Sequence, residues 1–286
     1  MRLVSFSSLI LVTVFSIAML PVRAETVDDL LKEAKAAGEK GKFKEALTLL
    51  GKAIKAAPSN PKVYLTRAAL YTVLQKPKEA IADYTKVIEL APKSIAAYSL
   101  RGGEHFKLGH IKESIADFDK QIALDPESYT NHWRRGISYY YAGRYADGAK
   151  QFEAGKKVYF NDVENAVWHF LCLARSSSVP KARKALLKIG KDPRVPLMEV
   201  YALFAGKAKP EDVLSAAKKT ARGAKPEVKK EQLFYAHLYL GLYYEVLGNQ
   251  KLAREHIQKA AKDYLIGHYM GDVARVHLAL MEKAKK

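Results

Sequence analysis

Cysteine is nearly absent from this sequence, since Cys172 is the only one in 286 residues. No intramolecular disulfide can therefore form. Cys172 lies in the strongly apolar run 167–173, which favours a buried, unreactive thiol over a nucleophile. If the protein is exported, the lack of disulfides fits a bacterial envelope better than a eukaryotic secretory pathway.

Acidic residues are scarce relative to basic ones. The chain has 30 Asp+Glu against 48 Lys+Arg, a net charge of +18. Without residues 1–24, which include Arg2 and Arg23, 46 basic residues face 30 acidic ones, or +16. This excess favours acidic partners or anionic polymers through long-range attraction. The lysines are scattered rather than gathered in one tract, so general solubility is the simpler explanation.

Sequence motifs of catalysis and nucleotide binding are missing. The chain contains no Gly-x-x-x-x-Gly-Lys-Ser/Thr, no Gly-x-Gly-x-x-Gly and no Gly-x-Ser-x-Gly. Its eight histidines include no His-Glu-x-x-His, and only His105 and His110 are close, with a turn expected between them at Gly109. We therefore expect no enzyme, no cofactor and no metal site. No nucleic-acid motif is visible, so nucleic acid is not an expected partner.

The N-terminus differs from the rest of the chain. Arg2 precedes an apolar stretch over residues 3–20, and Val22-Arg23-Ala24 places small residues where a signal peptidase requires them. We predict a signal peptide over residues 1–24 and an exported, periplasmic or secreted protein. An uncleaved membrane anchor is the alternative. No cysteine lies near this junction, which excludes the lipid anchor of bacterial lipoproteins.

Residue types recur every 34 positions along the chain. Prolines, arginines and small residues each form a series with this period. The series are Pro58, Pro92 and Pro126; Arg67, Arg101 and Arg135; and Ala46, Ala80 and Ser114. A fixed period of this length predicts stacked helical hairpins, and 34 residues is the length of the tetratricopeptide repeat. The predicted fold class is all-α, a tetratricopeptide-repeat helical-hairpin solenoid.

The repeat pattern divides the chain into four segments. After the signal peptide, residues 25–162 hold four repeats, 163–224 divergent helical hairpins, and 225–286 a tetratricopeptide-like repeat with a capping helix. The repeats start at residues 27, 61, 95 and 129. Helices are expected near 164–174, 180–189, 196–206, 210–221, 234–247, 252–262 and 273–283, with an exposed connection over 218–230.

The concave face of such an array is lined by positions 2, 5, 6, 9, 12 and 13 of each unit's first helix. In this sequence these positions form an apolar and aromatic groove, suited to an extended peptide or a partner helix. The predicted groove residues are Leu65, Thr66, Ala69, Leu100, Phe106, Lys107, Trp133, Arg134, Ile137, Tyr140 and Tyr141. Packing of Trp133 inside its own hairpin is the alternative. A cationic clamp for chaperone C-termini is absent, because its places hold Leu31, Lys35, Thr66, Ala96 and Leu100.

The arginine series has two interpretations. An anion-binding stripe is one, but Asp83 and Asp117 occupy position 23 of the second and third units, facing Arg67 and Arg101. Internal ion pairs are therefore predicted for these two arginines. Gln151 replaces the acid in the fourth unit, so Arg135 is expected to be freer to bind.

The order of the later segments resembles a particular family. Asn161-Asp162 precedes a tryptophan-containing helix, a Met-Glu-Val-Tyr helix follows at 198–201, and a late repeat leads to a helix with His277. This order resembles the bacterial envelope protein family called new lipoprotein I, over most of residues 61–282. The resemblance implies a helical array that dimerises and an adaptor that brings peptidoglycan endopeptidases to a processing protease. The family's lipid-bearing cysteine is missing here.

These observations favour an exported protein-binding scaffold that uses the concave groove, with cell-wall hydrolases or proteases as possible partners. The alternative is a basic binder of an anionic cell-envelope polymer. A homodimer is also expected, because Ala34 and Ala37 give the first helix a thin face that a second copy could cover.

Overall fold

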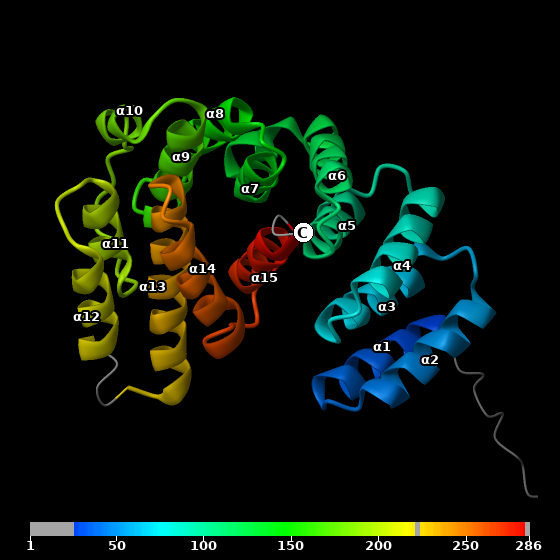
Figure 1. The fold of residues 1–286 in the computed structure, drawn as a ribbon. Helices are drawn as coiled ribbons and strands as arrows, with labels where there is room; N and C mark the ends of the chain where they lie inside the picture. The colour runs from blue at the N-terminus through cyan, green and yellow to red at the C-terminus, as the bar shows by residue number, and fades with distance from the viewer. Residues whose placement is uncertain (1–25, 221–223, 284–286) are drawn as a thin grey trace, which may run out of the picture.

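The computed structural model describes residues 26–220 and 224–283. The predicted signal peptide lies outside these residues, so its cleavage stays a prediction. All regular secondary structure in the described part is helical, and consecutive helices form antiparallel hairpins that follow a curved path. The all-α solenoid predicted from the 34-residue period is confirmed (Figure 1).

The first half of the array consists of four hairpins. Their helices are α1 (Val27–Glu39) and α2 (Phe43–Ala56), α3 (Pro61–Val73) and α4 (Pro77–Leu90), α5 (Ile95–Lys107) and α6 (Ile111–Leu124), and α7 (Trp133–Tyr141) and α8 (Tyr145–Gly155). Side-chain caps begin several of them, such as Asn60 accepting from the Lys62 amide and Ser94 accepting from the Ala97 amide. In the fourth unit a 3₁₀ helix (Pro126–Asn131) replaces the expected start of α7. His132, which joins this 3₁₀ helix to α7, is buried.

Position 15 of each unit turns the chain between its two helices. Gly41 and Gly109 both have φ of 72°, a left-handed conformation that glycine adopts without a steric cost. Gln75 occupies the same position in the second unit with φ of 54°. The predicted glycine turns are therefore present, and one unit tolerates a non-glycine residue there.

Small residues set the distance between the two helices of a hairpin. Ala46, Ala80 and Ser114 are fully buried on the second helices, as their period suggests. A Cβ atom added to Gly102 would lie 2.8 Å from Phe118 Cε1, so α5 approaches α6 more closely than alanine would allow. The small side chains thus have the packing role that the sequence predicts.

The second half of the array is less regular. It contains α9 (Val163–Ser176), α10 (Val179–Lys184), α11 (Leu197–Phe204), α12 (Pro210–Thr220), α13 (Pro226–Val246), α14 (Gln250–Gln258), a π-helical turn (Lys259–Asp263) and α15 (Tyr269–Lys283). The expected helix 180–189 is shorter than predicted, since α10 ends at Lys184. The connection expected over 218–230 is also shorter, because α13 already begins at Pro226 with proline in its first turn.

Helix α15 lies inside the curve of the array rather than at its end. Figure 1 shows it between α13 and α14 on one side and α5 and α7 on the other. Nine of its fifteen residues are buried, including Val273 and Leu278. The expected capping helix therefore packs on the concave face of the array through its buried residues, while Arg275, Ala279, Glu282 and Lys283 remain exposed.

No helix in residues 26–220 and 224–283 has the length and apolar character that a membrane-spanning helix needs.

Candidate binding surfaces on the concave face

Four of the predicted groove residues lie on an open part of the concave face. Leu65, Thr66 and Ala69 come from α3 and Leu100 from α5. Ala69 is exposed, Leu65 and Thr66 are half-buried, and Leu100 keeps 36% of its surface exposed. Beside them Val73, at the end of α3, is 65% exposed. We call Leu65, Thr66, Ala69, Val73 and Leu100 the open half of the groove.

The remaining apolar groove residues are buried against other parts of the chain, including its C-terminal helix α15. Phe106, Ile137 and Tyr140 are almost completely buried. The Tyr269 ring of α15 stacks on Phe106 and meets Trp133 edge-on, both with ring centroids 5.1 Å apart. Trp133 thus faces inward, as position five suggests, but its partner is α15. We call Phe106, Trp133, Ile137, Tyr140 and Tyr141 the covered half of the groove.

Three further groove residues also have partners within the chain. The Tyr141 hydroxyl lies 3.0 Å from Nδ1 of His277 on α15. Lys107 Nζ donates to Glu104 Oε1 at 2.7 Å, and that carboxylate also accepts the Thr72 hydroxyl. Arg134 Nη2 donates to Ser99 Oγ at 2.8 Å. A partner that reached these groups would have to replace existing contacts, so the open half is the accessible part of the predicted groove.

The arginine series forms internal ion pairs. Arg67 makes two hydrogen bonds of 2.7 Å to Asp83, and Arg101 makes two to Asp117 at 2.9 and 2.7 Å. The prediction for these two arginines is confirmed. The expectation that Arg135 is free is wrong, because its guanidinium lies 3.4 Å from Asp119 and over the rings of Tyr129 and Tyr139.

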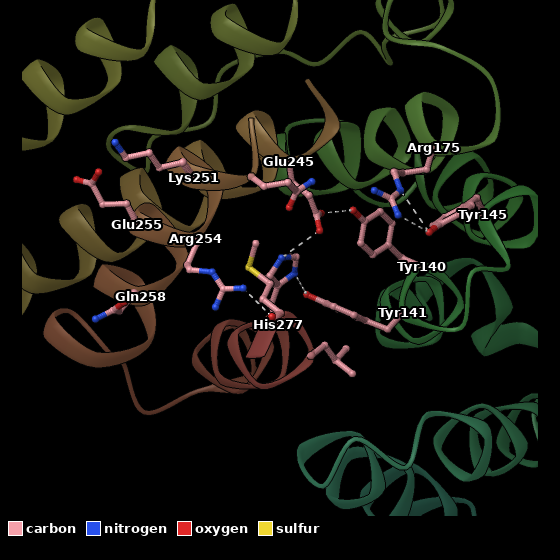
Figure 2. Close-up of a pocket in the computed structure, with 13 residues that line it drawn as sticks. Tyr140, Tyr141, Tyr145, Arg175, Glu245, Lys251, Arg254, Glu255, Gln258 and His277 are labelled. Carbon is pink, nitrogen blue, oxygen red and sulfur yellow. Dashed lines mark hydrogen bonds and ion pairs between the residues drawn. The ribbon is translucent and has the colours of Figure 1, made fainter. Parts of the chain in front are cut away.

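A cavity of about 790 Å³ lies where α7, α9, α13, α14 and α15 converge. We call it the α14–α15 cavity, and Figure 2 shows the side chains that line it. Two of them, Tyr140 and Tyr141, belong to the predicted groove. The others were not predicted, and they are Tyr145, Arg175, Glu245, Gln250, Lys251, Arg254, Glu255, Gln258, His277, Leu280 and Met281. They come from segments up to 136 positions apart, so no local pattern in the sequence identifies them.

Buried polar groups form one side of this cavity. The Tyr140 hydroxyl donates to Glu245 Oε2 at 3.0 Å, and His277 Nε2 lies 3.5 Å from Glu245 Oε1 without forming a hydrogen bond. Burial raises the pKa of both Tyr140 and Tyr141 well above its usual value, so both hydroxyls stay protonated. Burial also lowers the pKa of His277, which favours its neutral form. The group can bind a ligand by hydrogen bonds but contains no activated nucleophile.

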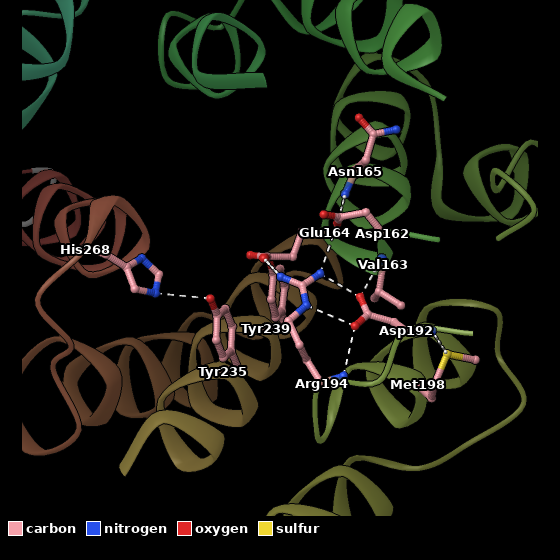
Figure 3. Close-up of polar contacts among 10 residues, drawn as sticks. All are labelled: Asp162, Val163, Glu164, Asn165, Asp192, Arg194, Met198, Tyr235, Tyr239 and His268. Atoms are coloured by element: carbon pink, nitrogen blue, oxygen red, sulfur yellow. Dashed lines mark hydrogen bonds and ion pairs between the residues drawn. The ribbon is translucent and has the colours of Figure 1, made fainter. Parts of the chain in front are cut away.

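A second cavity, of about 350 Å³, lies near the start of α7 next to Trp133, Tyr235 and Tyr269. At its edge Arg194 contacts three carboxylates, as Figure 3 shows. Its Nη1 lies 2.5 Å from Glu164, and its Nη2 lies 2.6 Å from Asp192. Tyr239 also donates to Glu164, whose pKa is raised by burial. These contacts join the loop before α11 to α9 and α13, so we assign them a structural role.

Groups that could support chemistry are sparse in the described residues. Cys172 is buried, as predicted, and burial raises the pKa of its thiol, which disfavours the reactive thiolate. No cluster of three histidine, cysteine or acidic side chains in residues 26–220 and 224–283 has the arrangement of a metal site. Ala34 and Ala37 are buried within the chain and do not form an open face for a second copy.

Comparisons with known proteins agree with the repeat. Residues 31–95 and 95–128 match two sequence models of the tetratricopeptide repeat. A tetratricopeptide repeat protein from Parabacteroides merdae is similar in structure, with a TM-score of 0.59, 17% identity and coverage of 90% of this chain and 98% of that one. The MamA protein is similar with a TM-score of 0.54, 20% identity and coverage of 68% and 95%. The curated proteins include no match.

These findings establish repeats and fold. Identities this low show the fold alone, and the fold is a solenoid typical of scaffolds without catalytic activity. The tetratricopeptide repeats support a protein-binding scaffold. Residues 31–128 carry tetratricopeptide repeats, within a chain that has the fold of a tetratricopeptide helical-hairpin solenoid.

Proposed function

We propose that the protein is an exported adaptor that binds a segment of another protein in the open half of its groove. The observation that carries this proposal is the exposure of Val73 and Leu100 on the parts of α3 and α5 that α15 does not cover. An apolar surface inside a curved array suits a partner helix or an extended peptide. The covered half contributes rigidity instead, because α15 already fills it.

Export, and a role near cell-wall hydrolases or proteases, form the finer part of the proposal. The apolar stretch 3–20 and the Val22-Arg23-Ala24 site support export. The order of segments after residue 161 supports an adaptor for murein-processing enzymes, by resemblance to new lipoprotein I. Homodimerisation rests on the same resemblance. N-terminal sequencing of the protein from its host tests export: a start at Glu25 is expected, and a retained Met1 would indicate an anchor.

Capture of partners by variants tests the open half. Residues 25–286 serve as bait in an envelope extract, and the bound proteins are compared with those that Val73→Glu captures. We expect the main partner to bind Val73→Glu at least about ten-fold more weakly, since a buried carboxylate replaces an apolar contact. Val158→Glu is the matched control, because Val158 is 45% exposed but follows α8, outside the open half.

Salt separates this proposal from the polymer alternative. Binding of an anionic envelope polymer would rest on the net charge of +16 that remains without residues 1–24, and would weaken steeply from low to moderate ionic strength. Groove binding through Val73 and Leu100 should persist over that range. Equal capture by both glutamate variants, with loss of all binding in moderate salt, would favour the polymer instead.

A further inference from the structure

Three cations at the α14–α15 cavity form no ion pair among the described residues. Arg175 donates to the Tyr145 hydroxyl, with Nη2 at 3.1 Å, and Arg254 donates to the Met281 carbonyl at 2.6 Å. Lys251, at the start of α14, is exposed and forms no ion pair within residues 26–220 and 224–283. Both guanidinium groups thus donate to neutral acceptors, and Glu245 is the carboxylate whose charge acts on Arg175. The cavity therefore has cations available for a ligand.

The acidic groups of the cavity do not cancel this charge. Glu255 pairs with Lys259 at 2.8 Å. Glu245 accepts the Tyr140 hydroxyl and lies beside His277, which burial keeps neutral. Three cations thus share one carboxylate, Glu245, whose charge acts on Arg175, so the cavity keeps an excess of positive charge.

The interior of the cavity also offers an unused hydrogen-bonding atom. His277 is only 3% exposed and lines the cavity, yet its Nε2 atom makes no hydrogen bond. Oε1 of Glu245 faces that nitrogen at 3.5 Å. A buried nitrogen of this kind is normally satisfied, by protein, water or ligand. A volume of about 790 Å³ is in the range of small-molecule and short-peptide sites.

The cations are distributed on two sides of the cavity. Figure 2 shows Arg175 on one side of Glu245 and His277, and Arg254 and Lys251 on the other. This separation suits two carboxylates better than a single phosphate. The carboxylate of Glu245 between them suits an N–H donor, such as a peptide amide.

We propose that the α14–α15 cavity binds a ligand with two carboxylates, either a short acidic peptide segment or a free dicarboxylic acid. Arg175 binds one carboxylate, and Arg254 with Lys251 binds the other. The site is separate from the open half of the groove, so it does not depend on the function proposed above.

Fluorescence anisotropy with a labelled, acetylated and amidated peptide tests the site directly. The peptide carries two glutamates separated by two alanines, and its matched control carries glutamines in their place. Residues 25–286 should bind the glutamate peptide at least about ten-fold more tightly, a factor that corresponds to about 1.4 kcal/mol and is within the range of one charge-assisted hydrogen bond.

Charge variants assign that binding to the cavity. Arg175→Gln combined with Lys251→Gln should weaken binding of the glutamate peptide at least about ten-fold, since both ion pairs are affected. Both side chains are exposed and form no ion pair within residues 26–220 and 224–283, so the variant should fold. Lys78→Gln combined with Lys93→Gln removes the same charge from exposed positions elsewhere and should bind normally. Arg254 is retained because it holds the Met281 carbonyl of α15.

Competition with glutarate distinguishes the two sources of carboxylate. Displacement of the peptide by glutarate supports a free dicarboxylic acid, while resistance to millimolar glutarate supports a peptide that also uses Glu245. Equal affinity for the glutamate and glutamine peptides would overturn the proposal. So would equal losses in the two double variants, or no binding of either peptide or glutarate at millimolar concentration.

Discussion

Arg101 joins the two helices of its hairpin through Asp117, and the carboxylate of that pair is nearly inaccessible to water. The Asp117 side chain is 6% exposed, against 58% for Glu89 in the surface pair Lys86–Glu89. A buried carboxylate that loses its partner remains charged in a poorly solvated site, whereas an exposed one is rehydrated. The two pairs should therefore respond very differently to the loss of their cation.

We predict that Arg101→Met lowers the free energy of unfolding by about 2 kcal/mol, less than for a fully buried pair because Arg101 is partly solvated. Lys86→Met, the matched control, should leave stability unchanged. Urea unfolding of the three proteins measures both effects. Equal stabilities would mean that the arginine series contributes nothing to the spine of the array.

His132 is the second residue whose environment has a measurable consequence. Its ring packs 4.8 Å from Phe118, and Nε2 lies 2.8 Å from the Gln121 oxygen. Burial, reinforced by Arg134 and Arg135, lowers its pKa from 6.5 to about 4. The folded protein therefore binds fewer protons than the unfolded chain between those pH values. Its contribution to stability is complete above pH 6.5 and is lost as the pH falls toward 4.

Acidification should accordingly destabilise the wild type more than His132→Gln. From pH 7 to pH 5 we expect the wild type to lose about 2 kcal/mol more than this variant, because the unfolded histidine takes up a proton that the folded one does not. His110→Gln, at an exposed position, is the control and should lose as much as the wild type. Equal losses of unfolding free energy between pH 7 and pH 5 in all three proteins would contradict the low pKa of His132.

At the scale of the helical element, small residues determine how closely a hairpin can pack. Gly102 on α5 has no room for a Cβ, since Phe118 and Asp117 would lie within 3.2 Å of it. Gly51 inside α2 has no atom within 4 Å of the same added Cβ. Glycine is therefore required at residue 102 and only tolerated at residue 51.

Opposite effects of alanine at these positions are predicted. Gly102→Ala should lower the free energy of unfolding by about 2 kcal/mol, because α5 and α6 must separate. Gly51→Ala should raise it by about 0.5–1 kcal/mol, the helix preference of alanine over glycine. Thermal and urea unfolding give the sign directly. A stabilising Gly102→Ala would show that the helices of this hairpin are not in close contact.

The period of 34 made the first four hairpins predictable to within a few residues, because each repeats the same local contacts. The same period predicted the ion pairs Arg67–Asp83 and Arg101–Asp117. It did not predict the partner of Arg135, because Asp119 lies on the preceding hairpin rather than at position 23 of the same unit. The divergent helices of residues 163–224 have no internal repeat, which explains why α10 ends at Lys184 rather than near residue 189.

At the scale of the whole molecule, the position of α15 decides which surface a partner can reach. Its contacts connect distant segments, as in Tyr141 with His277, and the bond from Arg275 Nη2 to Gln75 Oε1 spans 200 positions. Neither periodicity nor spacing reports such contacts, so the sequence predicted a continuous groove. In the structure α15 divides that groove into a covered half and an open half, and it also forms a wall of the α14–α15 cavity.

Hydrogen–deuterium exchange of residues 25–286, alone and with the partner captured from the envelope extract, tests the central claim most directly. Binding in the open half should slow exchange in residues 61–73 and 95–102, while α15 exchanges equally slowly in both states because it is already buried. Slower exchange confined to residues 226–283, with residues 61–102 unchanged, would contradict the assignment of the open half as the partner-binding surface.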